Sequence, residues 1–136
     1  MRKLKSIVLD SWAVMAYLED EPSGANVGTM IADAQDDGTP LLMSVVNVGE
    51  VWYTLARRRS VKDADETIRW LREVGVRIID ADWEITNIAA KFKVKGNISY
   101  ADCFAAALTK QNKATLLTGD HEFKHLEDEI SVVWLY

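Results

Sequence analysis

A buried helix that carries a single acid is predicted by residues 97–108, Asn97-Ile98-Ser99-Tyr100-Ala101-Asp102-Cys103-Phe104-Ala105-Ala106-Ala107-Leu108. Gly96-Asn97 indicates a turn, and Ser99 is a preferred N-cap residue. Apolar residues then recur at the spacing of a core-facing helical stripe. Asp102 falls in the first turn, where the positive end of the helix dipole stabilises negative charge. The sequence therefore places one carboxylate at the edge of a hydrophobic core.

Asp102 has two interpretations. In the first, Ser99-x-x-Asp102 is a capping box, and the acid only bonds the backbone at the start of its own helix. In the second, Asp102 belongs to a group of acids, because three others also follow short apolar runs. These are Asp10 after Ile7-Val8-Leu9, Glu50 one helical turn after Leu41-Leu42-Met43-Ser44, and Asp120 after Thr115-Leu116-Leu117-Thr118-Gly119. Asp10 and Glu50 also have local interpretations, Asp10 as an N-cap and Asn47-x-x-Glu50 as a capping box.

Short apolar runs alternate with helical patterns along the chain. Strands are predicted at residues 5–9, 41–44, 76–79, 115–117 and 131–135, and helices at 11–18, 25–34, 46–59, 60–74, 83–92 and from 99 onward, with a short helical piece at 122–126. The helix at 83–92 is expected to bury Trp83, Ile85, Ile88, Ala89 and Phe92. The pattern predicts a single domain over residues 1–136, with an α/β fold.

The expected architecture is an α/β/α sandwich of three layers around a central, mostly parallel five-stranded sheet. Ligands in such folds gather at the carboxyl ends of the strands. Asp10, Glu50, Asp102 and Asp120 can all converge at that edge. Four carboxylates in one crevice repel each other, and a divalent cation relieves that repulsion.

The composition is that of a soluble globular protein, with 49% hydrophobic and 27% charged residues and no run long enough to span a membrane. The basic residues at the N-terminus precede too short an apolar run for a signal peptide. The single cysteine, Cys103, cannot form an internal disulfide. A cytoplasmic location is therefore expected.

The net charge of −5 argues against a general nucleic-acid-binding protein. Basic residues nevertheless cluster locally, at Arg57-Arg58-Arg59, at Lys91, Lys93 and Lys95, and at Lys110 and Lys113. The three arginines have two interpretations. They contact the phosphates of RNA, or they complement the dipole at the C-terminus of their own helix.

Oxygen ligands alone favour Mg2+ or Mn2+, which are bound by a few carboxylates and keep open positions for phosphate oxygens. A phosphodiester is then the natural substrate, with the metal orienting a water for in-line attack. Ser11 and Thr118 are candidates to hold carboxylates or waters around the metal. As strand-end hydroxyls they have an equally good interpretation as partners of the backbone.

Nearly the whole chain resembles PIN-domain ribonucleases, and in particular the VapC toxins of bacterial and archaeal toxin–antitoxin modules. Four ordered stretches carry the resemblance: Val8-Leu9-Asp10-Ser11 with Ala16-Tyr17-Leu18 and Glu21-Pro22, Ser44-Val45-Val46-Asn47-Val48-Gly49-Glu50-Val51, Ser99-Tyr100-Ala101-Asp102-Cys103-Phe104-Ala105-Ala106-Ala107, and Leu117-Thr118-Gly119-Asp120-His121-Glu122-Phe123. Each motif is weak singly, but the ordered set is specific.

The resemblance implies a PIN-like domain that cleaves RNA endonucleolytically and depends on a divalent metal. It places Asp10, Glu50, Asp102 and Asp120 on the positions of the family's acidic site. It also implies inhibition by a cognate VapB-type antitoxin, whose C-terminal segment wraps the toxin, and frequent homodimers.

Three alternatives compete with this interpretation. His121-Glu122-Phe123-Lys124-His125 matches H-E-x-x-H, the zinc-protease signature, but no third histidine follows. Cys103 with a distant histidine would suggest a thiol nucleophile, although a buried packing residue fits its Ala-rich helix better. A non-catalytic PIN-like binding module is the third, with partner anchors drawn from an aromatic set that is otherwise expected mostly in the core: Trp12, Trp52, Trp70, Trp83, Trp134, Tyr53 and Tyr136.

Overall fold

A five-stranded, entirely parallel sheet forms the centre of the computed structural model, which describes residues 5–135. The strands are β1 (Ile7–Leu9), β2 (Leu41–Ser44), β3 (Val76–Ile79), β4 (Thr115–Thr118) and β5 (Ser131–Trp134), in the order β3-β2-β1-β4-β5. Each neighbouring pair is parallel. The predicted α/β fold is confirmed, and the five strands fall where the sequence pattern indicated.

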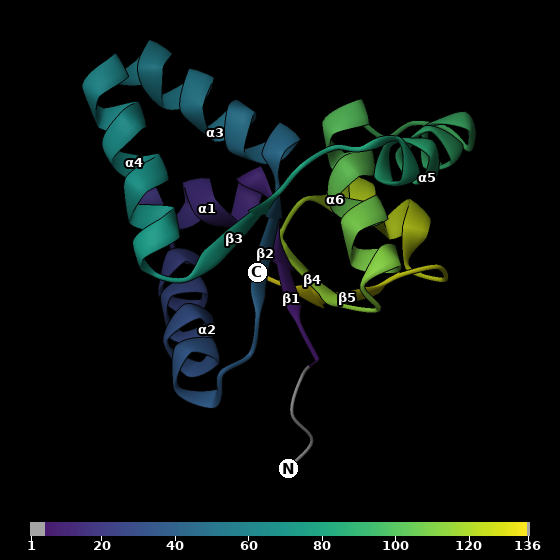
Figure 1. The fold of residues 1–136 in the computed structure, drawn as a ribbon, viewed down its shortest axis with the longest axis horizontal. Helices are drawn as coiled ribbons and strands as arrows, with labels where there is room; N and C mark the ends of the chain where they lie inside the picture. The colour runs from purple at the N-terminus through teal and green to yellow at the C-terminus, as the bar shows by residue number, and fades with distance from the viewer. Residues whose placement is uncertain (1–4, 136) are drawn as a thin grey trace.

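Helices cover both faces of the sheet (Figure 1). They are α1 (Ser11–Leu18), α2 (Gly24–Asp37), α3 (Val45–Arg58), α4 (Val61–Glu73), α5 (Trp83–Val94), α6 (Tyr100–Gln111) and the 3-10 helix η1 (His121–Leu126). One core lies between the sheet and α1 to α4, and the other between the sheet and α5, α6 and η1. This is the three-layer sandwich expected from the sequence.

The central strand β1 contributes to both cores, which explains its wholly apolar sequence. Ile7 and Leu9 point into the core under α1 to α4, while Val8 points into the core under α5 and α6. Side chains alternate between the faces of a strand, so a strand covered on both faces must be apolar throughout. The edge strands β3 and β5 are partly exposed, and they accordingly carry polar residues such as Arg77 and Ser131.

A crevice at the carboxyl ends of the strands follows from the strand order. β1 pairs with β2 on one side and with β4 on the other, so the chain first winds outward from β1 and later returns to its opposite edge. Ligand sites in open parallel sheets lie where the winding direction reverses. Asp10 directly follows β1, and Asp120 follows β4 by two residues. Both acids therefore flank the switch point.

One local prediction is wrong, and one interpretation that the sequence left open is excluded. Trp83 is 73% exposed, because α5 buries only a narrow stripe that includes Ile85, Ala89 and Phe92. Asn47 is not the N-cap of α3, since this helix begins directly after β2 and is capped by the Ser44 hydroxyl, which accepts from the backbone N–H of Val46 at 3.2 Å.

Other aromatic residues of the candidate set lie at the surface to differing degrees. Tyr53 is exposed, and four tryptophans are half-buried: Trp12, Trp52, Trp70 and Trp134. The core placement expected for most of the set is therefore only partly realised. Tyr136 and residues 1–4, which include the basic Arg2 and Lys3, lie outside the described residues. Among the helices that the structure does describe, none combines the length and the apolar run needed to cross a membrane.

Gly119→Ala is expected to destabilise the protein by about 1–3 kcal/mol, because the added methyl group overlaps the half-buried ring of Trp12 and forces it to shift. A Cβ at this position would lie 2.3 Å from the indole ring of Trp12. Gly49→Ala is the matched control. It lies in the interior of α3, where a Cβ meets no atom within 4 Å, so a gain of about 0.5–1 kcal/mol from helix propensity is expected. Urea unfolding curves of both variants test this pair, and equal midpoints would contradict it.

Candidate acidic metal centre

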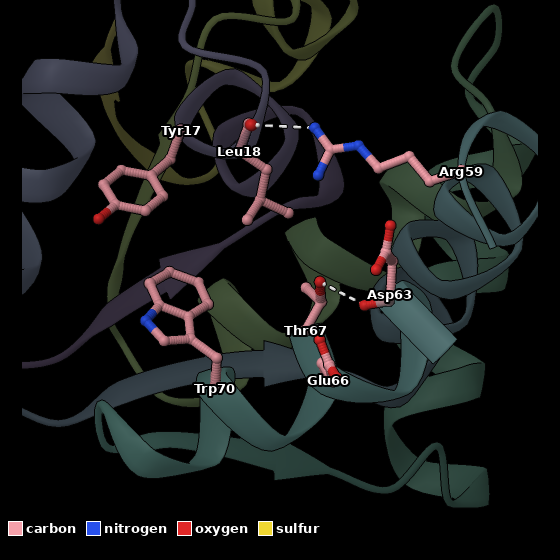
Figure 2. A pocket seen from close by; sticks show the side chains of 7 residues that line it. All are labelled: Tyr17, Leu18, Arg59, Asp63, Glu66, Thr67 and Trp70. Atoms are coloured by element: carbon pink, nitrogen blue, oxygen red, sulfur yellow. Dashed lines mark hydrogen bonds between the residues drawn. The ribbon is translucent and has the colours of Figure 1, made fainter. Parts of the chain in front are cut away.

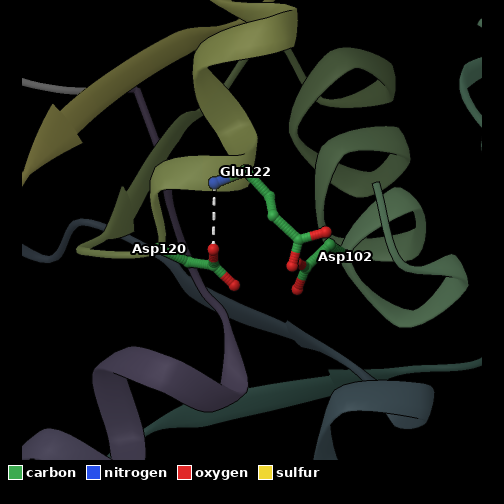
Figure 3. Close-up of side chains that lie close together, drawn as sticks. All are labelled: Asp102, Asp120 and Glu122. Atoms are coloured by element: carbon green, nitrogen blue, oxygen red, sulfur yellow. Dashed lines mark hydrogen bonds between the residues drawn. The ribbon is translucent and has the colours of Figure 1, made fainter. Parts of the chain in front are cut away.

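Three carboxylates meet at the carboxyl edge of the sheet. Asp102 lies in the first turn of α6, Asp120 in the loop after β4, and Glu122 in η1. One oxygen of each lies within 4.8 Å of one oxygen of each of the others (Figure 3). This spacing brings three negative groups within reach of one cation.

Asp102 is not held by the capping box that its sequence pattern allows. The Ser99 hydroxyl does cap α6, accepting from the backbone N–H of Asp102 at 3.2 Å. The backbone N–H of Ser99, however, donates to Glu122 Oε1 at 3.1 Å, so the reciprocal bond from the Asp102 carboxylate is replaced. Asp102 Oδ2 is buried and has no hydrogen-bond partner. A buried, unpaired carboxylate oxygen is costly, which indicates that it serves a ligand rather than the helix end.

Asp10 is completely buried and does cap its helix. Its Oδ1 accepts from the backbone N–H of Ala13 at 2.8 Å, and its Oδ2 accepts from the hydroxyl of Thr118. The same hydroxyl accepts from the backbone N–H of Asp120 at 3.0 Å. Asp120 in turn caps η1 by accepting from the backbone N–H of Glu122 at 3.0 Å. Thr118 therefore ties together the two acids that flank the switch point.

Glu50 is held in place by two donors on different helices. The Ser11 hydroxyl and the Asn47 side-chain amide each donate to Glu50 Oε1 at 3.0 Å. Asn47 is fully buried, and its amide also donates to the backbone oxygen of Ala101 at 3.1 Å. This one side chain thus connects α3, which carries Glu50, to the first turn of α6, which carries Asp102.

The acids line one open pocket of about 390 Å³. Glu50, Asp102, Asp120 and Glu122 contribute to its wall, together with Ser11 and Ser99. Asp10 does not reach the surface of this pocket, yet the charges of Asp120 and Glu50 act on it. All four predicted acids are thus brought to one region, with Asp10 fully buried and the other three in the lining of the pocket.

Burial and mutual repulsion shift the titration of two of these acids. Burial raises the pKa of Asp10 to about 7, and the nearby charges of Asp120 and Glu50 add to the rise. The pKa of Asp102 is also raised far above its usual range. Burial is the largest cause, and the hydrogen bond to Asp120 and the negative charge of Asp120 add to the rise. Without a cation, the cluster must take up protons near neutral pH.

The three consecutive arginines have different surroundings. Arg58 lines the acidic pocket and is ion-paired with Glu19. The Arg57 guanidinium lies 5.2 Å from the centre of the Tyr53 ring. Arg59 donates to the backbone oxygen of Leu18 at 3.2 Å and lines a second hollow, between α1 and α4 (Figure 2). Of the three, only Arg58 faces the acids.

The competing catalytic motifs lack their required geometry. His121 and His125 are exposed on a six-residue 3-10 helix, whose three residues per turn do not align positions four apart as the α-helix of a zinc protease does. Glu122, the glutamate of that motif, belongs to the acidic cluster instead. Cys103 is buried, and burial raises the pKa of its thiol to about 11. The expectation that Cys103 packs in the core is confirmed.

A scan against protein families matches residues 7–129 to the PIN domain. The chain belongs to the PIN domain family. A search of the curated proteins found no match.

Solved structures give the same result for the fold. This PIN domain is similar to VapBC2 from Rickettsia felis, bound to a DNA fragment from its promoter, at 16% identity and a TM-score of 0.75 over 96% of this chain and 98% of the other. It is also similar to the sarcin–ricin-loop-cleaving toxin VapC20 of Mycobacterium tuberculosis, at 19% identity and a TM-score of 0.69 over 88% and 94%. FitAcB from Neisseria gonorrhoeae matches at 22% identity and a TM-score of 0.66 over 93% and 95%. At these identities the likeness establishes the fold.

Sequence reasoning missed two polar residues of the acidic region of this PIN domain. The sequence patterns place Glu122 in the histidine motif and in the fourth PIN-like stretch, but not among the acids of the site. Its position two residues after Asp120 is itself a signal in a turn that follows a strand. Asn47 was assigned to a helix cap. Its place beside Val48 and Val51 on the buried stripe of α3 could have marked it as an inward-facing amide.

Proposed function

We propose that this PIN domain is a metal-dependent endoribonuclease and the toxin of a VapBC-type toxin–antitoxin system. The observation that carries the proposal is the meeting of Asp102, Asp120 and Glu122 within 4.8 Å, with a buried oxygen of Asp102 left without a partner. Family membership supports the same function, and one solved relative of the same fold is described as a toxin that cleaves the sarcin–ricin loop.

The donor set fits Mg2+ or Mn2+. All the facing groups are carboxylate oxygens, which are the ligands these hard cations prefer, and the described residues of the cluster include no thiolate or imidazole. Asp102, Asp120 and Glu122 would hold the ion, with Glu50 in the lining of the same pocket and Asp10 buried nearby. When bound, such an ion supplies an activated water and neutralises the charge that develops on a phosphodiester.

The surrounding residues position the acids. Ser11 and Asn47 fix Glu50 by two hydrogen bonds to one oxygen, which leaves the other oxygen free to orient a water or a metal-bound group. Thr118 fixes Asp10 and the backbone of Asp120 together. Preorganised side chains of this kind reduce the reorganisation that the reaction would otherwise require.

Cleavage of RNA by the purified protein tests the proposal directly. We expect cleavage in the presence of Mg2+ or Mn2+, complete loss with a chelator, and recovery when Mg2+ is restored. A zinc protease would instead recover only with Zn2+. Metal-saturated protein that cleaves no RNA substrate would support the binding-module alternative.

Arg58→Gln is expected to weaken RNA binding and to reduce the slope of log K against log salt by about 0.7, the contribution of one phosphate contact on a single strand. Arg58 lines the acidic pocket, where it can contact a phosphate next to the cleaved bond. Arg57→Gln is the control of equal charge, because Arg57 packs against Tyr53. Fluorescence anisotropy at several salt concentrations measures both slopes. Identical slopes in the two variants would indicate that Arg58 contacts no phosphate and only complements the dipole at the C-terminus of its helix.

A VapB-type antitoxin is the proposed partner, because one solved structure of the same fold is described as a toxin–antitoxin complex from Klebsiella pneumoniae, and another as a member of the VapBC family of toxin–antitoxin systems. The hollow in Figure 2 offers a surface for a partner segment. Its wall contains the stacked rings of Tyr17 and Trp70, whose centres are 5.2 Å apart, beside the acidic Asp63 and Glu66.

A homodimer and a cytoplasmic location complete the proposal. Co-expression with the product of a small adjacent gene, followed by size-exclusion chromatography, tests both associations.

A further inference from the structure

A third hollow, of about 490 Å³, lies on the surface of α5 and α6, outside the acidic pocket and the hollow between α1 and α4. Its floor is apolar, and Val94 at its rim is 87% exposed. Three lysines and one acid line it: Lys91, Lys95, Lys110 and Glu129. We call this hollow the lysine groove.

The lysine groove is positive in an acidic protein. Its lining carries three positive charges and one negative, a net of +2, whereas the chain as a whole has a net charge of −5. Lys95 and Lys110 share Glu129, with Lys110 Nζ 3.6 Å from its carboxylate. Among the described residues, Lys91 is ion-paired with no carboxylate. The groove therefore has positive charge to offer a polyanion.

A polyanionic substrate needs a positively charged surface outside the acidic pocket, because the pocket itself is negative. Four carboxylates line that pocket, and among its described lining residues Arg58 is the one basic side chain. Phosphates next to the cleaved bond are therefore repelled wherever a metal does not neutralise the acids. Binding energy for RNA must then come from contacts away from the reacting bond. A basic surface near the pocket would supply it.

The lysine groove is connected to the acidic pocket by one short segment. Lys95 lines the groove, and Ser99 lines the pocket. Four residues of extended chain span at most about 14 Å, so a strand of a few nucleotides can reach both. The segment is held by Lys93, which donates to the backbone oxygen of Ile98 at 2.7 Å, and by the bond from Ser99 to Glu122.

We infer that the lysine groove binds a single-stranded stretch of the RNA substrate that continues from the acidic pocket, with phosphates at Lys91, Lys95 and Lys110 and base edges against Val94 and Ile88. The inference rests on the proposed ribonuclease function and extends it to a second contact surface. Phosphate contacts of this kind hold RNA without reading its sequence, and they release counterions on binding.

The triple variant Lys91→Gln, Lys95→Gln, Lys110→Gln tests the inference. We expect it to bind a fluorescent single-stranded RNA of about 16 nucleotides roughly tenfold more weakly, and the salt slope to fall by about 2. The control is Lys62→Gln, Arg69→Gln, Arg72→Gln, an equal loss of charge from exposed positions of α4. Equal binding and an equal slope in the two triple variants would overturn the inference.

Glu129→Gln separates RNA binding from a purely structural role of the lysines. If the lysines bind RNA, removing the competing carboxylate tightens RNA binding, the opposite of the lysine changes. If the lysines only anchor Glu129, Glu129→Gln and the triple lysine variant behave alike: both have a lower melting temperature and an unchanged affinity for RNA. That second result would overturn the inference.

Substrate length and a competing polyanion complete the test. The lysine triple variant should cleave a dinucleotide at the wild-type rate while its kcat/KM on long RNA falls. Poly-glutamate of equal charge should displace RNA poorly, and equal displacement would identify the groove as a site for an acidic protein segment instead. Binding is measured without metal, and cleavage is measured with Mg2+ or Mn2+. Wild-type protein that cleaves no RNA with these metals would overturn the proposed function. The binding comparison would still decide the inference.

Discussion

Asp102→Asn is expected to reduce RNA cleavage by roughly a thousandfold or more, because a metal centre contributes several kcal/mol to stabilising the transition state. The same change should leave the metal-free fold equally stable or make it more stable. Asp102 is 6% exposed, and one of its oxygens lacks a partner, so its carboxylate is a cost to the fold when no cation is present. Initial rates at saturating Mg2+ and melting temperatures in chelator measure the two effects.

Asp33→Asn, on the exposed side of α2, is the control for this variant and should change neither quantity. The combination of lost activity with retained or increased stability is the signature of a functional carboxylate. If Asp102→Asn instead unfolds the metal-free protein at a lower temperature, Asp102 is a structural cap. The binding-module alternative predicts that partner binding survives in this variant while no activity exists to be lost.

The metal-free protein is expected to lose thermal stability as the pH rises from about 5 to about 9. Burial raises the pKa of Asp10 to about 7 and raises that of Asp102 further, whereas both titrate near 4 in an unfolded chain. Between these values the folded protein retains protons that the unfolded chain has released, so raising the pH favours unfolding. The stabilising contribution is complete below about pH 4 and is lost as the pH passes each folded-state pKa.

Mg2+ should reverse this loss, because the cation takes the place of the protons. We expect the melting temperature to rise on adding Mg2+ by about 5 °C or more near pH 8, and by much less near pH 5, where protons compete with the metal. Thermal melts across this pH range, with chelator or with Mg2+, measure the difference. Asp102→Asn should flatten the pH dependence in chelator. A melting temperature that rises with pH in chelator would contradict the assignment of buried, proton-binding acids.

The sequence was sufficient for the fold because the central strands are buried on both faces, and such strands must be continuous apolar runs like Ile7-Val8-Leu9. It also placed Asp10 and Asp120 correctly, since an acid directly after a buried strand can only lie at the sheet edge. The spacing of a capping box was less informative. Ser99 does cap its helix, whereas Asn47 lies inside one, and the two patterns look alike in the sequence.

Contacts between segments that are distant in the sequence account for the features of the site that the sequence did not predict. The orphan oxygen of Asp102 arises because Glu122, from another element, takes the backbone N–H of Ser99. The position of Glu122 itself depends on the tight turn of η1, which hydrophobic periodicity does not reveal. Trp83 lies on the apolar side of α5 by spacing, yet it sits at the first residue of the helix, where neighbouring elements do not cover it.

The hydrogen bond between Thr118 and Asp10 joins residues 108 positions apart in the chain. β4 must pair with β1 before this contact can form. During synthesis, Asp10 therefore leaves the ribosome before Asp120 and Glu122 have been added to the chain. The acidic centre can be assembled only after β4, Asp120 and Glu122 have been translated. Under the proposed nuclease function, a partly synthesised chain that lacks β4 has no complete acidic centre with which to cleave RNA.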